Sequence, residues 1–183
     1  MSWSNQSLHV ARRAAQYATT EDFRRLFLEQ IDNLYQLSLL LTADQSKAEQ
    51  CFVDGLQEAL DSNNIFRDWA GSWAKVVIIK NAIRVIQPRG WEPNPGLTMS
   101  RPNELADDES STLGPLLALG NFDRFVFVMT VLETYTDHDC AVLLDCSLAD
   151  VRNGRVRALE LIGHSVSAHR FAIPATMSVG REN

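Results

Sequence analysis

Residues 136–162 read TDHDCAVLLDCSLADVRNGRVRALELI, and this stretch decides the fold expected for the C-terminal part of the chain. Thr136, followed by Asp137 and Asp139, is typical of a helix N-cap with an acidic first turn. Ser147 is followed three residues later by Asp150, which resembles a capping box. The stretch therefore predicts two helices joined by a short turn, the second beginning at Leu148. This is the outline of a helix-turn-helix.

The second of these helices has both an apolar and a basic set of side chains. In a helix-turn-helix, the second helix enters the major groove with exposed donors in its N-terminal half. The apolar residues that can pack inward are Val151, Val156, Leu159 and Ile162. The side chains that can reach phosphates or base edges are Arg152, Asn153, Arg155 and Arg157. A solvated helix face in a plain bundle has nearly the same spacing, so spacing alone leaves both readings open.

The charge of the chain is acidic overall but uneven. The 183 residues carry a formal net charge of −6. That balance counts against binding nucleic acid through bulk electrostatics, because such domains usually carry a basic stripe. Three arginines nevertheless lie within residues 152–157, a segment without acids. The sequence thus predicts a local basic patch on an acidic domain.

Composition limits the class of protein. Hydrophobic residues make up 45% and charged residues 22% of the chain, which is the ordinary globular range. No apolar run approaches the roughly 20 residues that span a bilayer, and the first residues lack the apolar core of a signal peptide. The cysteines have no CxxC spacing, which argues against a disulfide framework or a zinc cluster. We expect a cytoplasmic protein without membrane attachment, metal or cofactor, and we find no enzyme motif.

The distribution of helical periodicity and of proline predicts the domain organisation. Apolar residues recur with helical spacing in residues 20–88 and 115–165. Residues 89–114 between them are rich in proline, glycine and acids, as flexible linkers are. We therefore expect an all-α fold of two small helical domains, with a linker at 89–114 and the helix-turn-helix in the C-terminal domain.

The first two helices of the N-terminal domain are predicted from caps and apolar spacing. A helix is expected from an N-cap at Thr20 to about Leu41, because its apolar residues follow one another at steps of three and four. Thr42 or Asp44 is expected to cap the second helix.

A third helix is expected from about Phe66 until Pro88 stops it. Val76–Ile79 alone could form a buried strand, but the chain offers no strand to pair with it, so helix is the preferred interpretation. Trp69 and Trp73 stand four residues apart, a spacing that is typical of aromatic side chains packed into a core.

Residues 122–162 resemble the C-terminal domain of extracytoplasmic-function sigma factors, which binds the upstream promoter element. The family has an apolar helix, a helix and turn of the pattern eg-s-eE-A--lg-s, and a recognition helix of the pattern V-sr--RA---L. In register with these patterns are Glu133, Thr136, Asp139, Ala141, Leu144, Ser147, Val151, Arg157, Ala158 and Ile162. Gly154 replaces a usual arginine and Arg155 takes a usually apolar place. Other helix-turn-helix regulators share the pattern.

The N-terminal half resembles the sigma domain that grips RNA polymerase. Its second predicted helix fits the family pattern AE------F--a at Ala48, Glu49, Leu56 and Ala59. Because acidic positions of that helix face the polymerase clamp in the family, the resemblance implies that Glu49 and Asp54 bind polymerase. Ordinary surface acids would give the same pattern.

Residues 73–86, WAKVVIIKNAIRVI, resemble the family's W-----RN---d--R helix, which contacts and melts the downstream promoter element. The resemblance implies DNA contacts, by stacking and by charge, from Trp73, Lys80, Asn81 and Arg84. Two positions depart from the pattern: Val85 takes the place of the usual acid, and Pro88 stands where a basic residue is expected.

Together these resemblances imply a sigma factor that joins RNA polymerase core and promoter DNA, with an anti-sigma factor as a further partner and no cofactor. A second class of function stays open. The weakened downstream helix and the acidic balance also fit a sigma-derived regulator or interaction module that does not itself initiate transcription.

Overall fold

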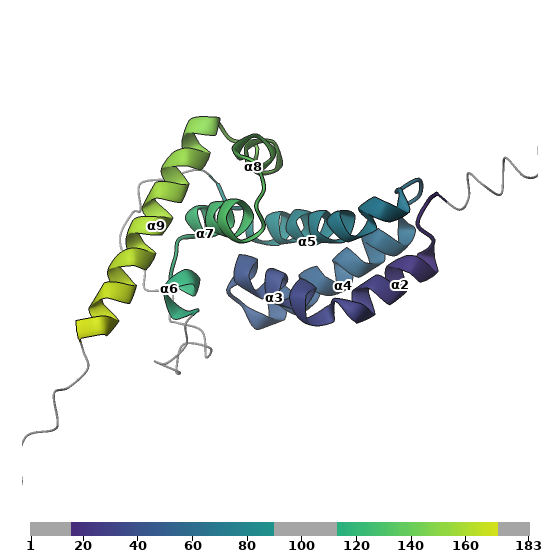
Figure 1. The fold of residues 1–183 in the computed structure, drawn as a ribbon, viewed down its shortest axis with the longest axis horizontal. Helices are drawn as coiled ribbons and strands as arrows, with labels where there is room; N and C mark the ends of the chain where they lie inside the picture. Colours follow the sequence, from purple (N-terminus) through teal and green to yellow (C-terminus); the bar gives the residue numbers. More distant parts are fainter. Residues whose placement is uncertain (1–15, 90–112, 172–183) are drawn as a thin grey trace, which may run out of the picture.

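The computed structural model describes residues 16–89 and 113–171, and its regular structure in this part of the chain is helical (Figure 1). The predicted all-α class is therefore confirmed for these residues. The elements are α2 (Thr20–Glu29), α3 (Ile31–Thr42), α4 (Gln45–Asp61), the 3-10 turn η1 (Arg67–Trp69), α5 (Ala70–Ile86), α6 (Gly114–Leu117), α7 (Asn121–Phe127), the π-helical turn η3 (Val128–Leu132), α8 (Asp137–Leu144) and α9 (Leu148–Phe171).

Side-chain caps begin several of these helices. The N-cap of α2 is Thr19, one residue before the predicted Thr20, and it forms a capping box with Asp22. The Asp44 carboxylate accepts from the Lys47 amide at 2.9 Å, so Asp44, and not Thr42, caps α4. At α8 the Thr136 hydroxyl accepts from the Asp139 amide at 3.1 Å, as predicted.

The single helix expected from residue 20 to about Leu41 is interrupted at Gln30. This residue has φ −114° and ψ 21° and ends α2, and α3 starts directly after it. The prediction of one continuous helix was wrong. The sequence does not indicate the break, because neither glycine nor proline stands there. The interruption changes the direction of the chain, so that α2 and α3 each pack against α4 and α5 (Figure 1).

Helix α5 supplies the centre of the N-terminal half. Val77, Ile78 and Ile79 are fully buried in it, which confirms the helical interpretation of the apolar run. Gly55 of α4 faces Ile78, and an ideal Cβ built there would lie 2.6 Å from the Ile78 Cδ1. Glycine therefore allows the close approach of α4 to α5.

Helix α9 lies across α7 through a narrow inward face. Val151 and Ala158 are fully buried, whereas Val156 and Leu159 are 53% and 48% exposed. The prediction that Val156 and Leu159 pack inward was wrong, because at about 100° per residue Val156 lies well round the helix from Val151. Gly154 occupies the inward position instead, and it is buried.

Helix α9 also extends past the expected domain end at residue 165. Its backbone stays helical to Phe171. The segment has no apolar periodicity, but it also contains no proline before Pro174 and so nothing that would stop a helix already started.

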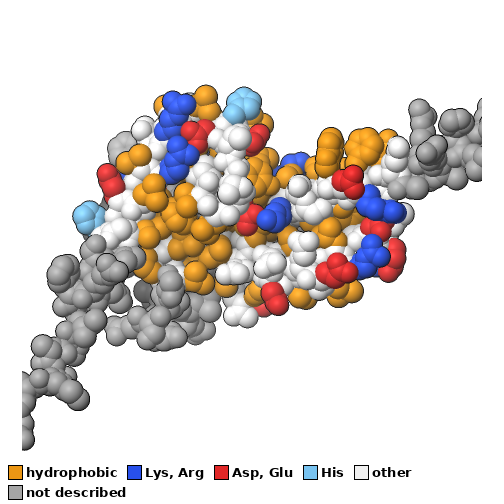
Figure 2. Space-filling model, in the orientation of Figure 1, with side chains coloured by type: hydrophobic (Ala, Val, Ile, Leu, Met, Phe, Trp, Pro, Cys, Tyr) orange, Lys and Arg blue, Asp and Glu red, His pale blue; other side chains and the backbone are white. Residues whose placement is uncertain are grey.

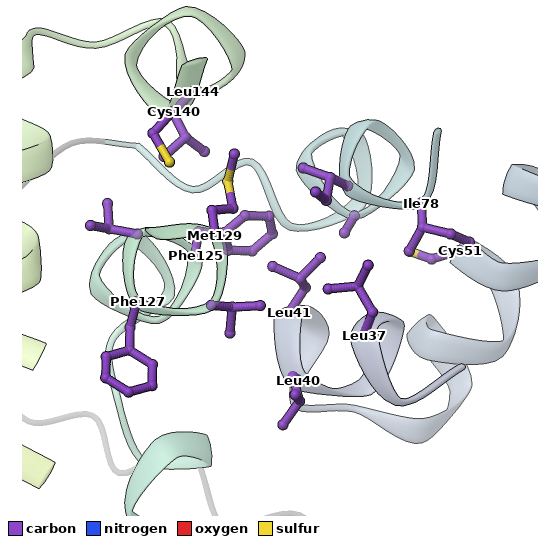
Figure 3. Close-up of a cluster of buried hydrophobic side chains, with 14 of the residues drawn as sticks. Leu37, Leu40, Leu41, Cys51, Ile78, Phe125, Phe127, Met129, Cys140 and Leu144 are labelled. Atoms are coloured by element: carbon purple, nitrogen blue, oxygen red, sulfur yellow. The ribbon is translucent and has the colours of Figure 1, made fainter. Parts of the chain in front are cut away.

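Helices α3 and α7 bring the two halves into contact, and α7 lies between α3 and α9 (Figure 1). Figure 3 shows side chains of both halves in one buried cluster, among them Leu37, Leu41, Cys51, Ile78, Phe125, Met129, Cys140 and Leu144. The division into domains 20–88 and 115–165 stays a prediction, and most of the predicted linker lies outside the described residues.

Polar contacts join the halves as well. The Arg124 side chain is 3% exposed, and its guanidinium donates to the α3 carbonyls of Leu41 at 3.2 Å and Thr42 at 3.4 Å. At the surface, the Lys75 Nζ lies 2.6 Å from the Glu133 Oε2. Within the part of the chain covered by the structure, no helix has both the length and the apolar character required to cross a membrane.

Candidate nucleic-acid and protein interfaces

The N-terminal half of α9 carries the four residues predicted to contact promoter DNA at the upstream element. Figure 2 shows basic side chains gathered over this end of α9, with acidic side chains beside them. Arg152 and Asn153 are exposed, the Arg152 side chain by 65%. Arg155 and Arg157 are only half-exposed. The four residues therefore differ in how readily they can meet a ligand.

Asp137, at the start of α8, binds two of these arginines. Its carboxylate accepts both Nη groups of Arg155, the second at 3.3 Å, and it also accepts from the Arg152 Nε at 3.4 Å. The hydrogen bonds from Arg155 are the main reason why the pKa of Asp137 lies below its usual value. The carboxylate is therefore ionised at neutral pH and holds both cations on the protein's own surface.

Arg157 has a separate acidic partner on α7. Its Nε and Nη2 donate to the two carboxylate oxygens of Asp123 at 3.0 and 2.6 Å. This two-point pairing is the geometry in which guanidinium binds carboxylate most strongly, and it raises the pKa of Arg157. Of the three arginines, Arg152 thus keeps the largest exposed surface.

A second candidate interface is an open hollow of about 660 Å³ between α4 and α5. Its lining residues are Asp54, Gln57, Glu58, Asp61, Ser62, Asn81, Arg84 and Val85. We call this hollow the α4–α5 groove. The groove brings together Asp54, predicted to bind polymerase, with Asn81 and Arg84, predicted to bind DNA. Three carboxylates against one guanidinium leave its lining acidic.

Asn81, Arg84 and Glu58 form a hydrogen-bonded network in this groove. The buried Asn81 amide donates to the Val77 carbonyl at 2.8 Å and accepts from the Arg84 Nη1 at 2.9 Å. The same Arg84 nitrogen lies 2.9 Å from the Glu58 Oε2. Asn81 is thus a structural hydrogen-bonding partner, and Arg84 is already paired with a carboxylate.

Trp73 and Lys80 form a contact of their own on α5. The Lys80 Nζ lies 4.9 Å from the centre of the Trp73 ring, a cation–π distance. The Trp73 Nε1 donates to the Ser62 hydroxyl at 2.9 Å, and the ring packs against the core. Both side chains are half-buried. Their surface is therefore available only in part.

Glu49 and Asp54 of α4 are not brought together. They are five positions apart in the sequence, so they point in different directions around the helix. Glu49 is exposed, and its carboxylate accepts from the side-chain amide of Gln45 at 3.2 Å. Asp54 is half-buried at the groove, and its carboxylate accepts from the side-chain amide of Gln50 at 2.8 Å.

An exposed aromatic cluster precedes α5. The Phe66 ring stacks on Tyr17 at 4.9 Å and meets Trp69 edge-to-face at 5.3 Å. The Trp69 side chain is 65% exposed, so the interpretation of Trp69 as a core residue was wrong. The helical spacing to Trp73 did not apply, because Trp69 is the last residue of the 3-10 turn η1 and α5 begins only at Ala70.

The chain was also compared with known proteins. No protein-family model matches it, and the curated proteins give no match.

Proposed function

We propose that this chain is a sigma-like transcription protein in which α8, the turn after it and α9 act as a helix-turn-helix on promoter DNA. The observation that carries the proposal is the exposure of Arg152 and Asn153 in the N-terminal half of α9. That half is the part of a recognition helix that reaches base edges and phosphates. The cap at Ser147, whose hydroxyl accepts from the Asp150 amide at 3.1 Å, fixes the start of the helix.

RNA polymerase core is the second partner in this proposal. Glu49 and the acidic α4–α5 groove with Asp54 present carboxylates along α4, and these suit a basic segment of the polymerase clamp. A second attachment matters energetically. A domain with one well-exposed arginine makes few phosphate contacts, so its unaided affinity for DNA is low.

A divergent regulator that does not initiate transcription is the second candidate. The pairing of the α5 residues favours it, because Asn81 is buried and Arg84 is held by Glu58. Opening of promoter DNA needs side chains that can bind an unpaired strand. In α5 these side chains already have internal partners.

The two candidates separate when the whole chain is mixed with RNA polymerase core and fragments of the source genome. A sigma-like protein co-elutes with core in gel filtration and opens promoter DNA, which permanganate detects at unpaired thymines. Co-elution without opening supports the regulator. Absence of both co-elution and DNA retention contradicts the sigma-like proposal.

Charge reversal tests the acidic contact with polymerase. Asp54→Lys and Glu49→Lys should each weaken co-elution with core about tenfold, because each replaces an attraction by a repulsion across the interface. Asp32→Lys is the matched control, since Asp32 is an exposed acid of α3 outside the groove. Equal losses in all three variants would show a dependence on net charge alone and would contradict a contact at Asp54 and Glu49.

A further inference from the structure

Asp137 stands where two arginines of α9 converge. Arg152 and Arg155 are three residues apart and so lie on neighbouring turns of one helix face. Both guanidiniums donate to the Asp137 carboxylate, which sits on α8, a separate element from the arginines. Two cations aimed at one oxyanion form an anion-binding arrangement, and the anion it holds is part of the protein.

We propose that Arg152 and Arg155 form a binding site for one backbone phosphate of DNA, and that Asp137 is the internal anion which the phosphate must displace. The inference rests on the proposed function, since it makes Asp137 control how tightly the same α9 surface binds DNA. Asp137 then competes with the phosphate for the two arginines and lowers the affinity of the site for DNA.

The chemistry of the groups supports an exchange. A phosphate diester and a carboxylate both offer oxygens that accept from a guanidinium fork, so one can take the place of the other. The side chains of Arg152 and Arg155 are 65% and 34% exposed, and that of Asp137 is 23% exposed. A ligand can therefore approach the pair from solvent. An ion pair this open is only weakly stabilising, which makes displacement by phosphate feasible.

The other arginine–acid pair on α9 has a different setting. Arg157 and Asp123 fix α9 to α7 beside Gly154, where an added Cβ would lie 3.2 Å from the Asp123 Oδ1. This pair lies at the contact between two packed helices. We assign it a structural role, and we keep the exchange to Asp137.

Other acids lie on α8, on α9 and in the turn between them. Asp139 lies in the first turn of α8, Asp145 in the turn before α9, and Asp150 in the first turn of α9. All three lower the affinity for phosphate through general repulsion. Within the described residues, Asp145 forms no ion pair with an arginine of α9. Asp145→Asn is therefore the matched control for Asp137→Asn. Asp145 has φ 50°, a conformation that asparagine tolerates well.

The experiment measures binding of the whole chain and its variants to duplex DNA by fluorescence anisotropy over a range of salt concentrations. Asp137→Asn should tighten binding about fivefold at moderate salt, the factor expected from removing one competing surface ion pair. The slope of log K against log salt should stay as in the wild type, because the phosphate makes the same contact in both proteins once Asp137 has been displaced. Asp145→Asn should tighten binding less than twofold and leave the slope unchanged.

A double-mutant cycle separates this role from a structural one. If the ion pair with Asp137 competes with the contact between Arg152 and phosphate, then Arg152→Ala should lower the affinity for DNA more in the Asp137→Asn background than in the wild type. Asp137→Glu keeps the charge and should bind like the wild type. If Asp137→Asn proves unstable, Asp137→Ser with the same cycle gives the comparison, because serine also suits the start of a helix.

The outcomes distinguish the two proposals. Equal affinities for Asp137→Asn and Asp145→Asn, or weaker binding by Asp137→Asn, overturn the exchange while the wild type still binds DNA and core as proposed. Failure of every variant to bind DNA removes both the DNA-binding function and the exchange. Binding by Asp137→Asn alone supports the exchange, since the internal anion then masks the site completely.

Discussion

At Gly154 the backbone of α9 packs directly against side chains of α7. A Cβ built there would lie 3.0 Å from the Phe122 ring and 3.3 Å from the Val126 Cγ2. Because Gly154 has no side chain, the two helices can approach closely at this point.

Substitution of this glycine has opposing effects. Gly154→Ala should gain about 1 kcal/mol of helix propensity but lose about 2 kcal/mol to overpacking against the buried Phe122 and Val126, a net loss of about 1 kcal/mol. The matched control is Gly163→Ala on the same helix, where an added Cβ meets nothing within 4 Å. That variant should be more stable than wild type. Urea unfolding followed by circular dichroism measures both, and a Gly154→Ala as stable as Gly163→Ala would contradict the close contact.

The partners of the α9 arginines mark the limit of prediction from sequence at this scale. Arg155 and Asp137 are 18 residues apart, and Arg157 and Asp123 are 34 apart. No local spacing connects such residues, because the pairing depends on how α7, α8 and α9 pack. The arginines were predictable as a group, whereas their neutralisation was not.

Among the elements, the helices with side-chain caps were predicted best. Asp44, Thr136 and Ser147 each form the expected bond to a first-turn amide. A cap is a local feature, so a few residues determine it. The break at Gln30 was missed because no residue at the break disfavours a helix.

Acidic caps give the helices a dependence on pH. The pKa of Asp22 lies below its ordinary value of 3.8, mainly because the carboxylate accepts from the Thr19 amide. At Asp150 the hydrogen bond with the Ser147 hydroxyl is the leading cause of a lowered pKa. Since the folded state lowers both pKa values, it binds fewer protons than the unfolded state. The stability from these caps is present above pH 3.8 and is lost as the pH falls below it.

We therefore expect the free energy of unfolding to fall as the pH is lowered from about 5 to about 2.5. Asp22→Asn should be less stable at pH 7 and should lose less stability on acidification, because it has no carboxylate to protonate at that cap. Asp32, an exposed acid of α3, supplies the control Asp32→Asn, whose pH profile should match the wild type. Urea titrations across this range provide the measurement, and parallel profiles for Asp22→Asn and wild type would contradict the role of the cap.

At the scale of the whole molecule, the buried contact between the two halves bears on whether they unfold as one unit. The sequence predicts two domains, but buried side chains of α3 and α7 meet in one cluster (Figure 3). Arg124 adds to this contact. Burial lowers the pKa of its guanidinium to about 10, and no carboxylate pairs with it among the described residues. Its acceptors are the carbonyls of Leu41, Thr42 and Leu119 and the side-chain oxygen of Asn121.

Such a side chain works as a joint between the halves. The C-terminal carbonyls of α3 carry the negative end of the helix dipole and have no hydrogen-bond partners within the helix. A guanidinium there donates hydrogen bonds to these carbonyls and also compensates the negative end of the dipole. Arg124→Met keeps much of the side-chain volume but leaves these carbonyls buried without a donor. We expect it to lower the free energy of unfolding by about 3 kcal/mol. The control Arg84→Met removes a half-exposed ion pair and should cost under about 1 kcal/mol.

The positions of the tryptophans allow the halves to be followed separately. All four, at residues 3, 69, 73 and 91, precede the C-terminal half. The fluorescence of Trp69 and Trp73 therefore reports the N-terminal half, while circular dichroism reports helices of both. If the joint makes one cooperative unit, the two unfolding curves of the wild type coincide. In Arg124→Met the dichroism curve should separate from the fluorescence curve, because the smaller C-terminal half loses more of its support. Curves that already differ in the wild type, and that Arg124→Met does not move further apart, would mean that the halves fold independently despite their contact.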